Sequence, residues 1–258
     1  MRYVLAVTAI LLLVASSASA SSVTAEFYDV DPGINVYVND PGVGVNNEYT
    51  TAGVYNFINV VITPKPYPSW PDGSVGDAAH PLRMFCIDVV RNVSGGTTYN
   101  NGWTLGGLGS PPISMNANQV SDIQKLFGTY YNNATLTSAT QSAAFQAALW
   151  EIVWETNGTL NVSGGNFSVN GGTNPTLMAA WDGSAEGSTA DIANDMLESL
   201  ATATLTQGVD VWVSDGVQNQ VMVVSTGKDI PPVPEPLTMA GLGMGICGLV
   251  TYIRKRRS

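Results

Sequence analysis

The chain has little cysteine: only Cys86 and Cys247 occur among its 258 residues. Cys247 lies in an apolar run near the C-terminus, so the rest of the chain carries Cys86 alone. A single cysteine cannot form an intramolecular disulfide, which excludes a disulfide-stapled scaffold. In an oxidising compartment a lone thiol is a liability unless it is buried or chemically occupied.

Histidine and basic residues are also few. His80 is the only histidine, and no Gly-x-Ser-x-Gly segment accompanies it, which argues against a Ser-His-Asp hydrolase. No His and Cys cluster has the spacing of a metal site, so no metal or other cofactor is expected. Residues 21–233 hold nineteen acidic side chains and five basic ones. This acidic excess argues against nucleic acid and anionic membrane surfaces as partners.

The first twenty residues have the organisation of a secretory signal peptide. A single positive charge precedes an apolar run that ends at Ala15, and Ala18-Ser-Ala20 is a small-residue cleavage signature. We therefore predict that residues 1–20 are removed and that the mature chain is exported.

The C-terminus combines three elements in order. A proline-rich linker, residues 230–236, precedes an uncharged run, Leu237–Ile253, and a basic tail, residues 254–258. At a rise of about 1.5 Å per residue, the run is near the lower length limit for a transmembrane helix. The tail stays cytoplasmic under the positive-inside rule, so the preceding domain faces outward. The residues that set this topology are Arg254, Lys255, Arg256 and Arg257.

Val233-Pro-Glu-Pro236, the glycine-rich run and the basic tail together resemble the PEP-CTERM sorting signal. The resemblance implies a Gram-negative bacterium whose exosortase recognises and cuts the chain near Pro234, Glu235 and Pro236. The helix is then a temporary tether in the inner membrane, and the product reaches the cell surface or the extracellular matrix. The alternative is a plain C-terminal membrane anchor.

Between these ends, residues 21–229 form an ectodomain long enough for one domain or two small ones. Alternating apolar residues between turn signals predict strands at 23–30, 34–38, 54–62 and 83–91, with turns at 31–33 and 40–42. Hairpins are expected within 160–169 and 209–224, and a loop anchored by Trp103 at 95–112. Helical spacing predicts helices at 116–131, 140–154 and 188–201. The expected fold is α+β, with a small helical cluster inserted in a β-rich subdomain.

The helix expected at 140–154 is apolar on nearly every side and therefore belongs in a core. Ser138 or Thr140 provides its N-terminal cap. Glu151 and Glu155 form its narrow polar strip, which we expect to face solvent. Gln146 lies within the apolar surface, and a buried amide without partners costs about 1–3 kcal/mol.

Two short motifs connect this helix with Cys86. The first is Phe85-Cys-Ile-Asp88, and the second is Phe145-Gln-Ala-Ala-Leu-Trp150. Together and in this order they resemble the thioester domains of bacterial surface adhesins. Both motifs agree with the motifs of that family at every defined position. The resemblance covers about residues 75–225.

In that family the cysteine sulfur and the glutamine side-chain carbonyl join as an internal thioester. Carried over to this chain, the resemblance implies a Cys86–Gln146 cross-link at the junction of a β portion and a helical one. Asp88 would orient a hydrogen-bond donor, and Trp150 would screen the bond from water. The residues that surround the bond are Phe85, Asp88, Phe145, Leu149 and Trp150.

A thioester is a stored electrophile. A primary amine, such as a partner's lysine, displaces Cys86 and forms an amide with Gln146, so the outcome is covalent adhesion in a single turnover rather than enzymatic catalysis. We expect an amine-bearing partner on a host, a neighbouring cell or the extracellular matrix. PEP-CTERM systems accompany exopolysaccharide production, which favours the matrix and makes exopolysaccharide a candidate partner.

Two alternatives stay open. In the first, the chain is a structural or glycan-binding matrix protein without a thioester, and Cys86 is a packed thiol. In the second, it is a secreted hydrolase that uses Glu151 and Glu155, because two carboxylates suffice for glycoside hydrolysis.

Overall fold

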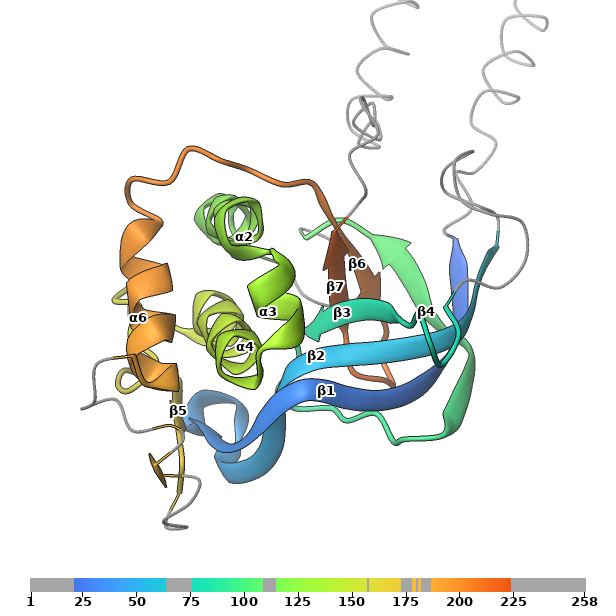
Figure 1. The fold of residues 1–258 in the computed structure, drawn as a ribbon, viewed down its shortest axis with the longest axis horizontal. Helices are drawn as coiled ribbons and strands as arrows, with labels where there is room; N and C mark the ends of the chain where they lie inside the picture. The colour runs from blue at the N-terminus through green and yellow to red at the C-terminus, as the bar shows by residue number, and fades with distance from the viewer. Residues whose placement is uncertain are drawn as a thin grey trace, which may run out of the picture. The chain divides into compact units, whose positions relative to one another are not determined.

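The computed structural model describes residues 21–63, 76–108, 115–156, 158–172, 178–179, 181 and 187–223 (Figure 1). The expected signal peptide, the sorting motif, the C-terminal helix and the basic tail lie outside these ranges. Within the described ranges, no helix is both long enough and apolar enough to cross a membrane. All of the described residues belong to one unit, Ala20–Ser225.

A long antiparallel hairpin forms one wall of the fold. Strands β1 (Ser22–Asp40) and β2 (Val45–Thr63) are joined by the short 3-10 helix η1 (Pro41–Val43), which confirms the turn expected at 40–42. The turn expected at 31–33 is wrong, because β1 runs through it with a shift in register between Val30 and Gly33. At this bulge the two backbones approach so closely that a side chain on Gly53 would collide with the Pro32 carbonyl oxygen.

Five further strands complete an antiparallel sheet. They are β3 (Leu82–Cys86), β4 (Thr97–Gly106), β5 (Ser168–Asn170), β6 (Val209–Val213) and β7 (Gln220–Val223). The order is β2-β3-β7-β6-β4-β1-β5, and β1 also pairs with β2, so six strands close into a ring. Closure gives each strand of the ring two neighbours, which limits the unpaired edges that promote association between chains, while β5 pairs with β1 alone.

Aromatic side chains fill the core of this ring. Phe57 packs edge-on against Trp103 and Trp212, with ring centroids 5.6 Å and 5.5 Å apart. Trp103 is only 1% exposed, which confirms it as a buried anchor. The loop expected around it is wrong: residues 97–106 form β4, which pairs with β1 and β6. The Gly and Asn residues of this segment concealed a strand whose partners are distant in sequence.

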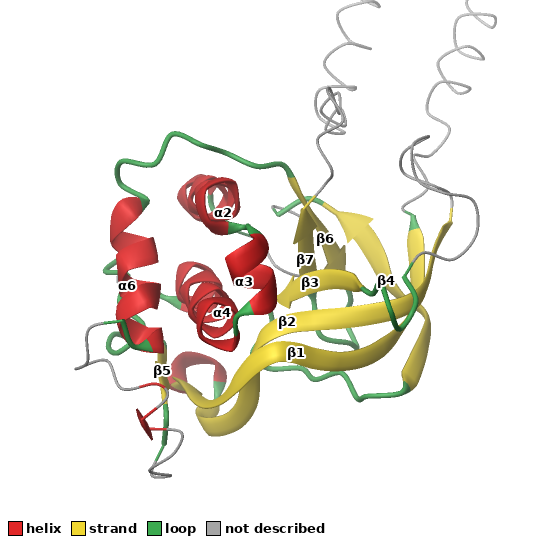
Figure 2. Ribbon diagram, in the orientation of Figure 1, coloured by secondary structure: helices red, strands yellow, loops and turns green. Residues whose placement is uncertain are grey.

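The helices gather beside the sheet (Figure 2). They are α2 (Ala117–Tyr130), α3 (Asn133–Thr137), α4 (Ala139–Trp154) and α6 (Thr189–Ser199). The three expected helices are confirmed, whereas α3 was not predicted. Asn116 and Gln119 form a reciprocal capping box at α2, and Ser138 caps α4.

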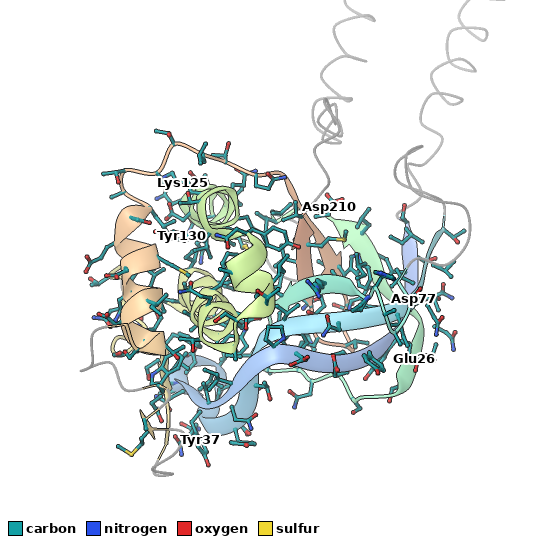
Figure 3. All side chains as sticks on the ribbon, in the orientation of Figure 1. Glu26, Tyr37, Asp77, Lys125, Tyr130 and Asp210 are labelled. Atoms are coloured by element: carbon teal, nitrogen blue, oxygen red, sulfur yellow. The ribbon has the colours of Figure 1, made fainter. Side chains whose placement is uncertain are left out.

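Helix α4 contacts the other three helices and also β1, β2 and β3. Side chains of α2 tie the outer helices together: Tyr130 donates to Ser199 Oγ at 2.8 Å, and Lys125 donates to the Leu200 carbonyl at 3.1 Å (Figure 3). The chain is thus mixed α+β, and the α-helices of its described part lie in sequence between β4 and β6.

Two other strand expectations differ from the structure. The strand expected at 83–91 ends at Cys86, because the Asp88 carboxylate accepts from the backbone N–H groups of Val90 and Arg91 and turns the chain. The hairpin expected within 160–169 is reduced to one backbone contact, in which the Val169 N–H donates to the Val162 carbonyl at 2.8 Å, and β5 pairs as a strand with β1 at Tyr37–Asn39. The hairpin expected within 209–224 is confirmed as β6 and β7.

Candidate functional site

One stripe of α4 carries four polar side chains at successive intervals of four residues: Ser142, Gln146, Trp150 and Trp154. Residues four apart lie on the same helical face. Ser142 Oγ donates to the Pro32 carbonyl at 2.8 Å, and Trp154 Nε1 donates to the Ile87 carbonyl at 3.0 Å. The stripe therefore anchors α4 to the backbone of the sheet.

Gln146 makes the central contact of this stripe, with the backbone of Cys86. Its Oε1 accepts from the Cys86 N–H at 2.9 Å, and its Nε2 donates to the Cys86 carbonyl at 2.6 Å. Both residues are fully buried. The partners of this buried amide are therefore the backbone N–H and carbonyl of a single residue.

The geometry of β3 explains why those two groups are free to bind Gln146. Along a strand, successive residues direct their N–H and C=O groups to alternate edges. Ile87 N–H bonds the Asn219 carbonyl on the β7 side, so the groups of Cys86 face the β2 side. Strand β2 pairs with β3 only across Leu82–Met84. Beyond that point the Gln146 side chain takes the place of a strand.

The Cys86 sulfur lies against the backbone of Asp88. The thiol donates to the Asp88 carbonyl, with sulfur and oxygen 2.8 Å apart, and the Asp88 N–H donates to the sulfur at 3.2 Å. Burial raises the pKa of the Cys86 thiol far above its ordinary value of 9.0. The Asp88 backbone lowers that pKa in part, the charge of the Asp88 carboxylate raises it, and the Trp150 indole and the Tyr55 hydroxyl lower it by smaller amounts. The thiol therefore stays protonated near neutral pH.

The Asp88 side chain fixes the turn that follows Cys86. Its carboxylate accepts from the backbone N–H groups of Val90 and Arg91, from Arg91 Nη1 at 2.9 Å and from Asn219 Nδ2 at 2.9 Å. Because Asp88 is 2% exposed, these donors replace the hydrogen bonds that its carboxylate would make to water. Asp88 acts through backbone geometry, because the same turn places its own N–H and carbonyl beside the sulfur.

The sequence analysis missed three buried amides of the β6–β7 hairpin, two before β7 and one at its first residue. Gln218 Nε2 donates to the Asp88 carbonyl at 3.2 Å, and Gln220 Nε2 donates to Gln218 Oε1 at 3.2 Å. Asn219 bonds the Asp88 carboxylate and also accepts from the Ser214 N–H at 2.6 Å. The signal was the run of three amides at the start of an apolar strand, but nothing local connects that run with Cys86.

The other residues expected around the bond are all buried. Phe85 and Phe145 pack with ring centroids 4.5 Å apart, and Phe127 meets Phe145 edge-on at 5.0 Å. Leu149 is fully buried and Trp150 is 1% exposed. The structure thus brings the two sequence motifs together within one apolar environment. The expected sorting residues, 234–236, and topology residues, 254–257, lie outside the described ranges.

The expectation for Glu151 and Glu155 is wrong, because neither faces solvent. Glu151 is fully buried and Glu155 is 7% exposed. Glu151 accepts from the Asn161 N–H at 2.7 Å, and Glu155 accepts from the N–H groups of Asn166 and Phe167. Both carboxylates hold the chain segment that follows α4, which removes the support for a glycosidase pair open to substrate.

Glu151 leads to a prediction about pH. Burial raises its pKa from 4.5 to about 8, an effect that the Asn161 N–H opposes and Glu155 reinforces. The folded chain keeps a proton that the unfolded chain releases, so Glu151 lowers the free energy of unfolding as the pH rises from 4.5 to about 8. In urea titrations across this window, Glu151→Gln should lack that contribution. The exposed control Glu198→Gln should keep the wild-type pH dependence; a Glu151→Gln curve that also keeps it would contradict the prediction.

The described part of the chain contains no group of three or more His, Cys, Asp or Glu residues that could hold a metal ion. A cavity of about 330 Å³ lies beside Asn101 and Asp215, and another of about 210 Å³ lies beside Asn170 and Trp181. Neither is lined by Cys86 or Gln146. Any amine that reaches this pair must first displace residues that cover it.

Comparison with protein families, curated proteins and solved structures found no match for this chain. The likeness to thioester domains therefore rests on the two motifs and stays a prediction.

Proposed function

We propose that this chain is an exported surface or matrix protein that forms an internal thioester between Cys86 and Gln146 and attaches covalently to a primary amine. One observation carries the proposal: the Gln146 amide is buried and held at both its ends by the backbone of the residue that bears the thiol.

This arrangement suits attack on an amide, which is a poor electrophile. The Cys86 N–H donates to Gln146 Oε1, the atom on which negative charge develops when sulfur attacks the carbonyl carbon. The Cys86 carbonyl holds Nε2, the atom that leaves. Fixing the amide beside the thiol also removes much of the entropic cost of the encounter. The S–C bond forms, the C–N bond breaks, and the thiol proton departs on nitrogen as ammonia.

The second step is attachment. A primary amine adds to the Gln146 carbonyl carbon, the C–S bond breaks, and a proton from the amine returns to the sulfur. The product is an amide to the partner and a free Cys86 thiol. Burial of both residues slows the competing reaction with water.

The chain ends give the proposal its cellular setting. Residues 1–20 are a signal peptide, residues 237–253 a transmembrane tether, and residues 234–236 the motif at which an exosortase acts. The partner is an amine-bearing macromolecule of the cell surface or matrix.

The test is an intact mass of the purified ectodomain before and after incubation with methylamine. The wild-type chain should be lighter than its sequence by one ammonia, and methylamine should add to Gln146 while Cys86 becomes alkylatable. Cys86→Ala is the matched control, because it removes the sulfur but keeps the backbone groups that bind Gln146. The proposal would be contradicted if the wild-type chain had the full mass expected from its sequence and never took up methylamine.

A second candidate function has its own supporting observation. The amide of Gln146 is fully paired with the backbone, and burial keeps the Cys86 thiol protonated. Both residues then serve the fold alone, in a structural or glycan-binding matrix protein. The same mass measurement separates the two functions.

A further inference from the structure

Trp150 stands apart from its neighbours on the α4 stripe. Ser142, Gln146 and Trp154 each donate to a backbone carbonyl of the sheet. Trp150 is 1% exposed, yet its Nε1 has no hydrogen-bond acceptor among the residues that the structure describes. A buried donor without an acceptor is costly and rare in folded proteins. Its presence in an otherwise satisfied stripe calls for a physical reason.

The Cys86 sulfur is a group that this donor influences, because the Trp150 side chain lowers the pKa of the Cys86 thiol. Trp150 follows Gln146 by one helical turn on the same face, so both side chains are directed at the end of β3. The Trp150 indole is therefore among the groups that stabilise the ionised form of the thiol. In the resting chain the sulfur keeps its proton and donates a hydrogen bond to the Asp88 carbonyl.

We infer that the Trp150 N–H is a donor held for the Cys86 sulfur as it leaves Gln146 under attack by an amine, and that it sets the rate of this displacement. The inference rests on the proposed function and assigns a residue to its second step. When the C–S bond breaks, its electron pair passes to the sulfur, which is charged until the proton of the amine reaches it.

A charged sulfur in an apolar core needs fixed donors, because no water stabilises it there. The Asp88 N–H, 3.2 Å from the sulfur, is one such donor. Trp150 supplies a second, whose hydrogen bond forms only when charge develops. Interactions that strengthen in the transition state accelerate a reaction, whereas those already made in the ground state do not.

The experiment compares Trp150→Phe with Trp154→Phe. Each variant loses one indole N–H on the same helical stripe, but only that of Trp154 is already bonded to a backbone carbonyl. Methylamine uptake is followed by intact mass over time. Trp150→Phe should slow uptake about ten- to a hundredfold, the effect of one hydrogen bond to a charged group. Trp154→Phe should slow it far less.

Stability should show the opposite order. Trp150→Phe also leaves a cavity, because Trp150 is 1% exposed, so stability is compared in variants that keep the ring shape. With the ring shape kept, losing the Trp150 N–H removes a donor that has no acceptor and the urea midpoint should hold, whereas losing the Trp154 N–H leaves the Ile87 carbonyl without its donor. Replacing either indole by benzothienylalanine, which keeps the ring shape, separates the N–H from the volume change. A reactive wild type with equal rates in both variants overturns the inference alone. A wild type that never forms the thioester overturns both the inference and the proposed function.

Discussion

Gln146→Leu is expected to be less stable than Cys86→Ala by about 2–6 kcal/mol in free energy of unfolding, because it leaves two buried backbone groups of Cys86 without partners. The comparison is made between the two variants because neither can form the cross-link. Their difference therefore reports the hydrogen bonds rather than the covalent bond. Urea unfolding followed by tryptophan fluorescence measures it.

Cys86→Ala itself should cost little more than its lost burial, about 1 kcal/mol, relative to a chain without the cross-link. It leaves the N–H and carbonyl that Gln146 binds in place. Equal stability of the two variants would mean that the Gln146 amide does not satisfy the end of β3. That result would remove the geometric basis of the thioester while leaving the sequence motifs untouched.

Asp88→Ala is expected to lower the free energy of unfolding by about 1–3 kcal/mol, because it leaves the buried Asn219 amide and the N–H groups of the following turn without their acceptor. Asp88 is 2% exposed and receives donors from Val90, Arg91 and Asn219. Loss of the carboxylate frees the turn after Cys86, so the Asp88 N–H and carbonyl no longer hold the sulfur.

The matched control is Asp122→Ala. Asp122 and Lys125 are also three residues apart and lie 3.4 Å from one another, but both are partly exposed. Such a pair contributes about 0–1 kcal/mol. Thermal unfolding of the two variants at one pH compares them directly. A cost for Asp88→Ala no larger than that for Asp122→Ala would show that the turn after Cys86 does not depend on its carboxylate.

Helix positions could be predicted because their signals are local. The Asn116 and Gln119 pair that starts α2 and the Ser138 cap of α4 are each complete within a few residues. The β6–β7 hairpin is local in the same sense. The apolar surface of α4 also predicted its burial, since a helix without a polar face cannot remain at a surface.

Features that depend on distant partners could not be predicted. The sequence predicted that Glu151 and Glu155 face solvent. Their carboxylates are instead buried and accept from backbone N–H groups of residues 161–167, which lie in a later segment of the chain. Strand β5 has only three residues, too few for an alternating pattern to show in the sequence. It forms because it pairs with β1 at Tyr37–Asn39. The burial of the Gln218 and Gln220 amides could not be predicted for the same reason, because Gln218 bonds Asp88, which is distant in sequence.

By itself the sequence determined which residues form α2, α4 and α6, that α4 is buried, and that Cys86 is the only thiol before the C-terminal run. Only the tertiary structure decided what Gln146 binds. The Cys86 N–H and carbonyl are open to it because β2 leaves β3 after Met84, and that departure depends on strands and helices far apart in the chain. Whether a backbone group is paired is a property of its neighbours in space, and no local pattern records them.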